Sequence, residues 1–301
     1  MNFKKLIEQQ GLTIFPVGLG GCRTSSVSFD LCDYDITIFD EKPEPDTFVS
    51  FEDKLICIHH GSLKETQSKI LIQYDQMQII QDESWELQMF LSKIKEKRLN
   101  LFNDFAKNCL IDSLFCCKKC KDGINSSNVF ASCWQKCASF YLADAICALN
   151  QKNSSPSHML DMMRKFSKTP VNKNISIINE TVGIERATPI LLERMLKSTI
   201  GFSDLIEKNS HSQIIQQKHD FFVKNSMLSD SYFYLGYINK ENFTKIKSTL
   251  KRQPDLIHIL KIAFDVESDS NLLLHQGDLV QKSCNEILEI ISRGLFSNVL
   301  Y

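Results

Sequence analysis

The sequence predicts an α+β fold, in which a small mixed β-sheet near the N-terminus is followed by an all-α helical region. Short apolar runs rich in β-formers fill the first part of the chain, and glycine and proline residues separate them. From residue 85 onward, apolar residues recur at helical spacing. We therefore expect a first domain over residues 1–84 and a helical domain over residues 85–301, with a possible sub-boundary near residues 167–178.

The elements of the first domain can be placed from these patterns. Residues 2–10 predict a short amphipathic helix that ends at Gly11. The runs that predict strands lie at residues 13–19, 34–39, 54–60 and, for one or two further strands, within 70–80. Residues 40–46 carry two prolines and predict a polar loop, since proline is excluded from a central strand.

The second part of the chain reads as helices joined by short polar connections. Charged ends and apolar stripes predict helices near residues 85–97, 101–121, 129–151 and 158–166, and then in a series from residue 179 onward. Residues 167–178 are polar and predict a surface connection. Pro189 and Pro254 suit first-turn positions of helices.

Composition limits the classes of function. The chain has 301 residues, of which 43% are hydrophobic and 24% charged, as in an ordinary globular protein. A formal net charge of -1 argues against a broad nucleic-acid-binding surface. Neither an apolar run of transmembrane length nor a secretory signal is evident, so we expect a cytoplasmic protein with no membrane partner. The eleven cysteines show no disulfide framework, and we expect thiols.

The most informative chemistry lies at two aspartates near the glycine-rich turn that follows the first strand. Asp33 and Asp35 are two residues apart, so in a strand they project from the same face. Two adjacent carboxylates repel each other unless a cation lies between them, and Mg²⁺ prefers carboxylate oxygens while leaving positions for phosphate. The alternative is a strand end with solvated aspartates beside an ordinary turn.

The glycine turn supplies hydrogen-bond donors, in contrast to the negatively charged carboxylates of the two aspartates. Gly20 and Gly21 allow close approach to the backbone, whose N–H groups can bind phosphate oxygens. Hydroxyls of Thr24 and Ser25 follow, so this turn is a candidate cradle for a triphosphate.

Residues 13–39 resemble the signature of the nucleotidyltransferase superfamily, which includes polymerase β, the CCA-adding enzymes and the minimal and aminoglycoside nucleotidyltransferases. That signature is an apolar strand, Gly-Ser or Gly-Gly, a polar loop and then Asp-x-Asp in a strand. Here Gly21-Cys22 aligns with Gly-Ser, so that Cys22 departs from the pattern, and Cys32-Asp33-Tyr34-Asp35 aligns with Ser-Asp-x-Asp. If Gly20-Gly21 is the matching pair, the departure disappears and the spacing is one residue longer.

The resemblance implies transfer of a nucleoside monophosphate from a nucleoside triphosphate to an acceptor hydroxyl, with release of pyrophosphate. Asp33 and Asp35 are then the catalytic ligands of Mg²⁺ or Mn²⁺. Gly20, Gly21 and Cys22, with Thr24 or Ser25, would bind the phosphates, and Arg23 would neutralise charge on pyrophosphate. These last six residues complete the predicted nucleotide-binding set.

A third carboxylate often comes from a later strand in this family, and Asp75 is the acidic residue inside a strand-like run of this chain. Asp75 is equally compatible with a turn between two short strands. His59 and His60 are adjacent and face opposite ways in a strand, so one of them can reach the site, although an edge or core histidine is the simpler interpretation.

Two further questions stay open from the sequence. Cys117, Cys120, Cys133 and Cys137 have a spacing seen in structural zinc sites, while buried helix faces that use cysteine as a small apolar residue are the alternative. The acceptor can be a small molecule, a protein or an RNA end. Other functions compatible with the residues are a catalytically decayed nucleotide-binding or interaction protein and an RNA-modifying nucleotidyltransferase.

Overall fold

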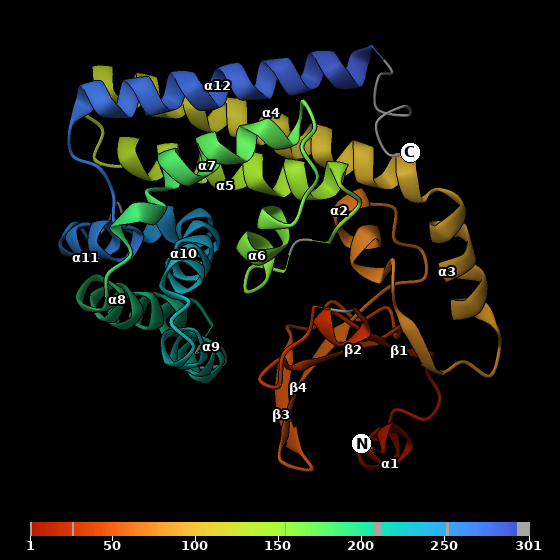
Figure 1. The fold of residues 1–301 in the computed structure, drawn as a ribbon. Helices are drawn as coiled ribbons and strands as arrows, with labels where there is room; N and C mark the ends of the chain where they lie inside the picture. The colour runs from red at the N-terminus through yellow and green to blue at the C-terminus, as the bar shows by residue number, and fades with distance from the viewer. Residues whose placement is uncertain (1, 26, 154, 208–211, 251–252, 294–301) are drawn as a thin grey trace. The chain divides into compact units, whose positions relative to one another are not determined.

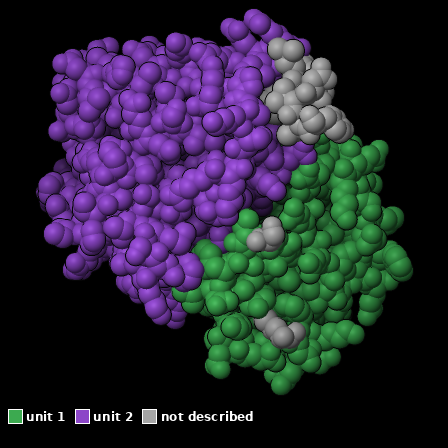
Figure 2. Space-filling model, in the orientation of Figure 1, with its two compact units in different colours: residues 1–105 green, residues 106–301 purple. Residues whose placement is uncertain are grey.

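A computed structural model describes residues 2–25, 27–153, 155–207, 212–250 and 253–293. It confirms the predicted α+β fold, with a five-stranded mixed sheet near the N-terminus and helices after it (Figure 1). The chain divides into two compact units, residues 1–105 and residues 106–301 (Figure 2). The first unit extends beyond the last strand and includes the helix that follows the sheet.

Unit 1 contains the sheet, and its elements agree with the expected order over most of its length. They are α1 (Phe3–Gln9), β1 (Val17–Gly20), η1 (Cys22–Thr24), β2 (Tyr34–Ile38), β3 (Thr47–Phe51), β4 (Lys54–His60), α2 (Ser68–Leu71), η2 (Ile72–Tyr74), β5 (Gln78–Gln81) and α3 (Glu86–Glu96). The long helix α4 (Arg98–Asn125) begins in this unit.

The strands are arranged in the order β3-β4-β2-β1-β5. β1 is antiparallel to both β2 and β5, β3 is antiparallel to β4, and β2 is parallel to β4. The two strands predicted on either side of the glycine turn therefore pair with each other. The strand predicted over residues 54–60 is confirmed with the same bounds.

Of the one or two further strands predicted within residues 70–80, the structure has one, β5, and the residues before it are helical in α2 and η2. Leu71, Ile72 and Tyr74 are all buried. A strand would point the neighbours Leu71 and Ile72 to opposite faces, whereas a helical turn buries both on one side. The apolar residues of this segment are therefore buried by a helical turn and not by a strand.

The sheet buries one set of alternating side chains against α1. Leu6 and Ile7 of α1 form a core cluster with apolar residues of the three central strands, namely Val17, Leu19, Ile36, Ile38, Ile56 and Ile58. The opposite face carries the residues between them, and there Met77 and Phe39 pack with apolar side chains of α3. Since successive strand residues alternate in direction, Asp35, Cys57 and His59 belong to the face opposite α1.

Unit 2 is helical throughout the part of the chain that the structure describes. Its elements after α4 are α5 (Ala131–Leu149), α6 (Met159–Arg164), η3 (Asn172–Asn174), α7 (Ile175–Val182), η4 (Ile184–Arg186), α8 (Pro189–Glu207), α9 (Ser212–Lys224), α10 (Leu228–Leu250), α11 (Asp255–Phe264) and α12 (Ser270–Ser292). Pro189 begins α8 as predicted. Among the described residues, no helix is both long and apolar enough to cross a membrane.

Helix α5 is buried along almost all of its length and forms the centre of this unit. It also carries two buried charged side chains. Asp144 accepts hydrogen bonds from Tyr237 (2.9 Å) and from the ammonium of Lys240 (2.7 Å). The Lys240 ammonium also lies 4.3 Å from the ring centroid of Tyr141, so a charge in this interior has both an ionic and an aromatic partner.

Lys136, the second buried charge of α5, has weaker compensation. Its ammonium donates to the carbonyl of Val182 (2.6 Å) and lies 3.3 Å from the hydroxyl of Tyr232. Burial lowers the pKa of Lys136 from 10.5 to about 8, although the carboxylate of Asp265 opposes that shift. Close to neutral pH the folded protein therefore holds this proton less tightly than the unfolded chain does.

Stability should consequently depend on pH through Lys136. Because the folded pKa lies below the unfolded value, the unfolded chain binds more protons between these two values, and stability gains as pH rises through that window. We expect the unfolding free energy of the wild type, relative to Lys136→Met, to rise by about 2 kcal/mol between about pH 7 and about pH 9.5. Urea denaturation at a series of pH values measures it.

The exposed Lys118, also in this unit, provides the matched control. Lys118→Met should leave the difference from the wild type constant over the same pH range. Parallel stability curves for the wild type and Lys136→Met would contradict the shifted pKa.

Candidate functional site

The pairing of β1 with β2 places the glycine turn beside an aspartate. In this antiparallel pair, Gly20 lies directly opposite Asp35. Asp35 in turn lies beside Cys57 of the parallel strand β4. The end of β1 and the start of β2 therefore meet at the same end of these two interior strands, as the sequence predicts. We call this end of the strands the sheet edge.

Gly21 is required at this point for two separate reasons. Its φ is +68°, in the left-handed region that favours glycine. A Cβ at this position would also lie 1.7 Å from Oδ2 and 2.7 Å from Cγ of Asp35, so the Asp35 carboxylate would have to move. The Asp35 carboxylate thus packs directly over the Cα of Gly21.

Hydroxyl groups close the turn that follows. Thr24 Oγ1 donates to the carbonyl of Gly21 (2.9 Å), and Ser25 Oγ donates to the carbonyl of Cys22 (2.8 Å). Both bonds hold the backbone in the single turn of η1. The hydroxyl oxygens keep acceptor capacity, but their protons serve the turn itself.

Arg23 holds the polar loop against the turn. Its Nε donates to the carbonyl of Cys32 (2.9 Å), and its Nη2 donates to the carbonyl of Asp30 (2.8 Å). Its guanidinium also lies 4.6 Å from the ring centroid of Tyr34. Arg23 is therefore a structural element of the loop, and its contact with pyrophosphate stays a prediction.

The two predicted metal-binding aspartates are close to the expected positions. Asp35 is the second residue of β2, and Asp33 directly precedes the strand. Both are half-buried, and the side chain of Asp35 is 27% exposed. A ligand approaching this edge of the sheet can thus reach the carboxylate of Asp35.

His59 is the unexpected neighbour of Asp35. Its Nε2 lies 3.2 Å from Oδ1 of Asp35, and its Nδ1 lies 2.9 Å from Oδ1 of Asp46. Burial alone would lower the pKa of His59, but the hydrogen bonds to Asp35 and Asp46 outweigh it and raise the pKa to about 12. His59 is consequently an imidazolium that bridges two carboxylates. His60 faces away and contacts Asp40 instead, at 3.0 Å.

Asp46 was not among the predicted site residues, because from the sequence it belongs to the polar loop of residues 40–46. The residue immediately precedes β3, and β3 pairs with β4 so that Thr47 lies opposite Ile58. This register continues to bring position 46 next to His59. The alternating pattern of residues 47–51, read as the first strand of a hairpin with residues 54–60, is the signal that would have found it.

The donor atoms at this edge fit a metal ion only in part. Asp35, Cys57 and His59 each place one ligand atom within 4.8 Å of the others. Oxygen, sulfur and nitrogen together form a softer set than the oxygens that Mg²⁺ prefers. Within the described part of the chain, Asp33 does not join this group of three. The donor atoms described at this edge therefore do not by themselves form the all-oxygen set that Mg²⁺ prefers, and binding of Mg²⁺ by Asp33 and Asp35 stays a prediction.

Asp75, the predicted third carboxylate, is engaged elsewhere. It follows η2 in a helical turn rather than lying in a strand. Its side chain is 8% exposed, and Nε of Arg98 lies 2.6 Å from its Oδ1. This half-buried ion pair joins the start of α4 to the end of η2, which is a structural role.

The four cysteines with zinc-like spacing are fully buried in α4 and α5. Across the described residues, the groups of three or more possible metal ligands do not include Cys117, Cys120, Cys133 or Cys137. Burial raises the pKa of the Cys120 thiol to about 11 and that of Cys133 to about 12, which favours the protonated form. The burial of these thiols and their raised pKa values support the interpretation that cysteine serves here as a small apolar residue.

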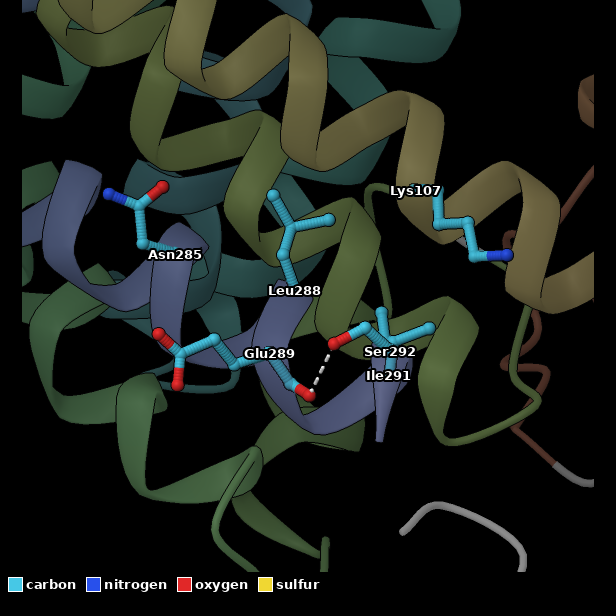
Figure 3. Close-up of a pocket in the computed structure, with 6 residues that line it drawn as sticks. All are labelled: Lys107, Asn285, Leu288, Glu289, Ile291 and Ser292. Atoms are coloured by element: carbon cyan, nitrogen blue, oxygen red, sulfur yellow. Dashed lines mark hydrogen bonds between the residues drawn. The ribbon is translucent and has the colours of Figure 1, made fainter. Parts of the chain in front are cut away.

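Unit 2 has a groove between α4 and α12 with a volume of about 810 Å³ (Figure 3). Lys107 contributes from α4, and Glu289 and Ser292 from α12, where Ser292 Oγ donates to the Glu289 carbonyl. The residues predicted to carry the chemistry do not line it. The sheet edge of unit 1 is therefore the candidate functional site.

Comparisons with known proteins do not identify a family for this chain. No protein-family model matches the chain, and no curated protein matches it significantly. The resemblance of residues 13–39 to nucleotidyltransferases accordingly rests on the residues themselves.

Proposed function

We propose that this chain is a metal-dependent nucleotidyltransferase, which moves a nucleoside monophosphate from a nucleoside triphosphate to an acceptor hydroxyl and releases pyrophosphate. The observation that carries the proposal is the contact between the carboxylate of Asp35 and the backbone of Gly21. Transfer of this kind requires positioning and charge neutralisation more than covalent chemistry. A carboxylate for the metal and a glycine turn for the phosphates, side by side, supply both requirements.

Each group at the edge then has a role. Mg²⁺ or Mn²⁺ held by Asp33 and Asp35 would neutralise charge on the triphosphate and on the attacking oxygen. The N–H groups of Gly20, Gly21 and Cys22 would bind the phosphate oxygens, while the space that a Cβ of Gly21 would fill is taken by the carboxylate of Asp35. Hydroxyl oxygens of Thr24 and Ser25 orient this backbone through their bonds to the turn.

His59 favours a second candidate function, namely nucleotide binding without transfer. The imidazole lies between Asp35 and Asp46, so that a cationic group of the chain itself already neutralises Asp35. In such a protein the glycine turn would bind nucleotide, and the two carboxylates would need no metal ion. The two candidates differ in whether pyrophosphate is released.

Removing the charge of either predicted metal ligand tests the proposal. Asp33→Asn and Asp35→Asn should each reduce metal-dependent pyrophosphate release about 100-fold or more, because an amide neither neutralises nor binds Mg²⁺ as a carboxylate does. The assay uses each of the four nucleoside triphosphates with Mg²⁺ or Mn²⁺ and cell extract as the source of acceptor. Asp30→Asn, which changes an exposed carboxylate of the same loop, is the control and should retain activity.

The outcomes separate the two candidates. Undiminished pyrophosphate release in both variants would rule out the proposed roles of Asp33 and Asp35. Thermal stabilisation by nucleotide without any release in the wild type would select the binding protein. A labelled nucleotide transferred by the wild type would identify the acceptor class.

Gly21→Ala tests the contact between the turn and Asp35. The variant should lose nucleotide binding and about 1–3 kcal/mol of stability, because the added methyl group collides with Asp35 and the left-handed conformation is strained. Gly11→Ala is a matched control, since Gly11 has a φ of +67° but nothing within 4 Å of a Cβ. It should cost only the conformational strain and leave nucleotide binding unchanged.

A double substitution distinguishes collision from strain. In Gly21→Ala with Asp35→Ala, the collision is absent, so the loss of stability should be smaller than the sum of the two single effects. Additive losses in urea denaturation would show that Asp35 and Gly21 are not in contact in solution.

A further inference from the structure

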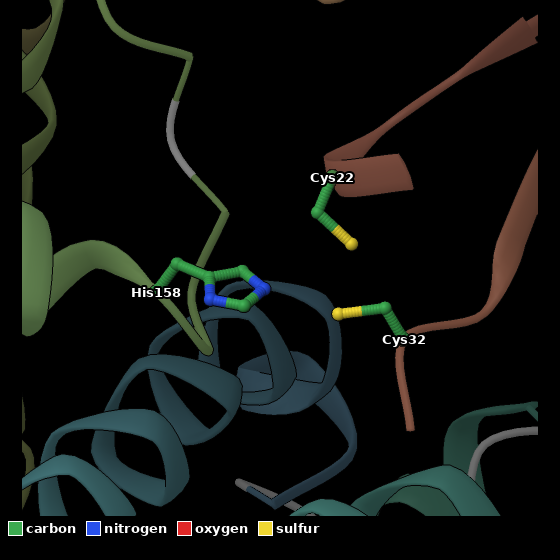
Figure 4. Close-up of side chains that lie close together, drawn as sticks. All are labelled: Cys22, Cys32 and His158. Carbon is green, nitrogen blue, oxygen red and sulfur yellow. The ribbon is translucent and has the colours of Figure 1, made fainter. Parts of the chain in front are cut away.

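Two thiols from separate segments meet beside the glycine turn. Cys22 begins η1, and Cys32 lies immediately before Asp33 at the other end of the polar loop. Their sulfur atoms lie within 4.8 Å of each other (Figure 4). A disulfide has an S–S distance of about 2 Å, so the two sulfurs must approach each other by rotation of their side chains before they can bond.

The loop is held in the arrangement that brings these sulfurs together. The guanidinium of Arg23, the residue after Cys22, donates to the carbonyls of Asp30 and Cys32. The backbone N–H of Phe29 also donates to the sulfur of Cys32 (3.4 Å). Both contacts fix Cys32 relative to the turn. Rotation of the Cys32 side chain would replace the contact with Phe29, whereas the Arg23 contacts are made to backbone carbonyls and can persist.

The two thiols differ in accessibility. Cys22 is half-buried, whereas the side chain of Cys32 is only 3% exposed. A small oxidant from solvent therefore reaches Cys22 first and finds Cys32 behind it. This is the arrangement of a reactive thiol with an adjacent resolving thiol.

We propose that Cys22 and Cys32 are a peroxide-responsive thiol pair that forms a reversible disulfide next to the candidate site. The sulfur of Cys22 attacks hydrogen peroxide, breaks the O–O bond and becomes a sulfenic acid, with release of one water. The sulfur of Cys32 then attacks the sulfenic sulfur, forms the S–S bond and displaces hydroxide, which leaves as a second water with the proton of the Cys32 thiol. Two thiols and one peroxide thus give one disulfide and two waters.

A consequence for activity rests on the proposed function. The disulfide would tie Cys22 of the glycine turn to the residue before Asp33. Phosphate-binding and metal-binding segments would then move as one unit, and the turn could no longer adjust to a triphosphate. We expect the oxidised protein to bind nucleotide more weakly, and dithiothreitol to restore binding.

Peptide mapping tests the disulfide independently of activity. The full chain is treated with hydrogen peroxide, its remaining thiols are alkylated and it is digested with trypsin. Cleavage after Arg23 separates the two cysteines, because residues 6–23 contain only Cys22 and residues 24–54 contain only Cys32. We expect these two peptides linked, and two fewer of the eleven cysteines alkylated than in the reduced protein.

Variants and a control complete the experiment. Cys32→Ser should leave Cys22 to oxidise further to sulfinic acid, while Cys109→Ala, which removes a buried thiol of α4, should still form the linked peptides. Linked peptides that involve other cysteines, or sulfinic acid at Cys22 in the wild type without any linkage, would overturn the proposal. Since mapping uses the wild-type protein, a variant that fails to fold does not leave the question open.

Nucleotide binding is then compared before oxidation, after oxidation and after reduction. Reversible weakening in the wild type supports the link to the site. A disulfide with unchanged nucleotide affinity overturns that link but not the thiol pair. If the reduced protein binds no nucleotide, the proposed function fails, while the peptide map still decides the disulfide.

Discussion

The register between β1 and β2 is the constraint on which the candidate site depends. It sets Gly20 opposite Asp35, and at Gly21 the absence of a Cβ lets the Asp35 carboxylate lie against the backbone of the turn. A shift by one residue would turn Asp35 toward the apolar face covered by α1 and would bury Ile36 on the wrong side. The hydrophobic pattern that stabilises the sheet therefore also places the carboxylate beside the turn.

Electrostatics at this edge depends on how the charge of Asp35 is balanced. His59 provides one cation within hydrogen-bond distance, shared with Asp46. A divalent ion at the same carboxylate would have to displace the imidazolium or bind Oδ2, the oxygen that packs against Gly21. A triphosphate changes this balance because it brings several negative charges and further oxygen ligands. Metal and nucleotide should therefore bind together more readily than metal binds alone.

Local sequence patterns predicted those parts of the fold whose secondary structure depends on neighbouring residues alone. The strand at residues 54–60 contains a continuous apolar run of β-forming residues, and the turn at Gly21 has a positive φ that favours glycine. Within residues 70–80 the sequence left the number of strands open, because a short apolar run suits a strand or a buried helical turn equally well. Asp46 and His59 come together only through the hairpin of β3 and β4, so their contact depends on a long-range register. Arg98 likewise binds Asp75 across a separation in sequence that no local pattern reveals.

The departure of Cys22 from the Gly-Ser pattern has a physical meaning in this setting. A thiol is a weaker hydrogen-bond donor than a hydroxyl, so a phosphate at the turn would depend more on backbone N–H groups there. The same substitution places a sulfur within 4.8 Å of Cys32, which a serine could not use for a covalent bond. At this position a cysteine would therefore donate a weaker hydrogen bond to phosphate than a serine, but it can form the proposed disulfide with Cys32. Because Arg23 holds both segments together, the chain itself provides the geometry for that chemistry.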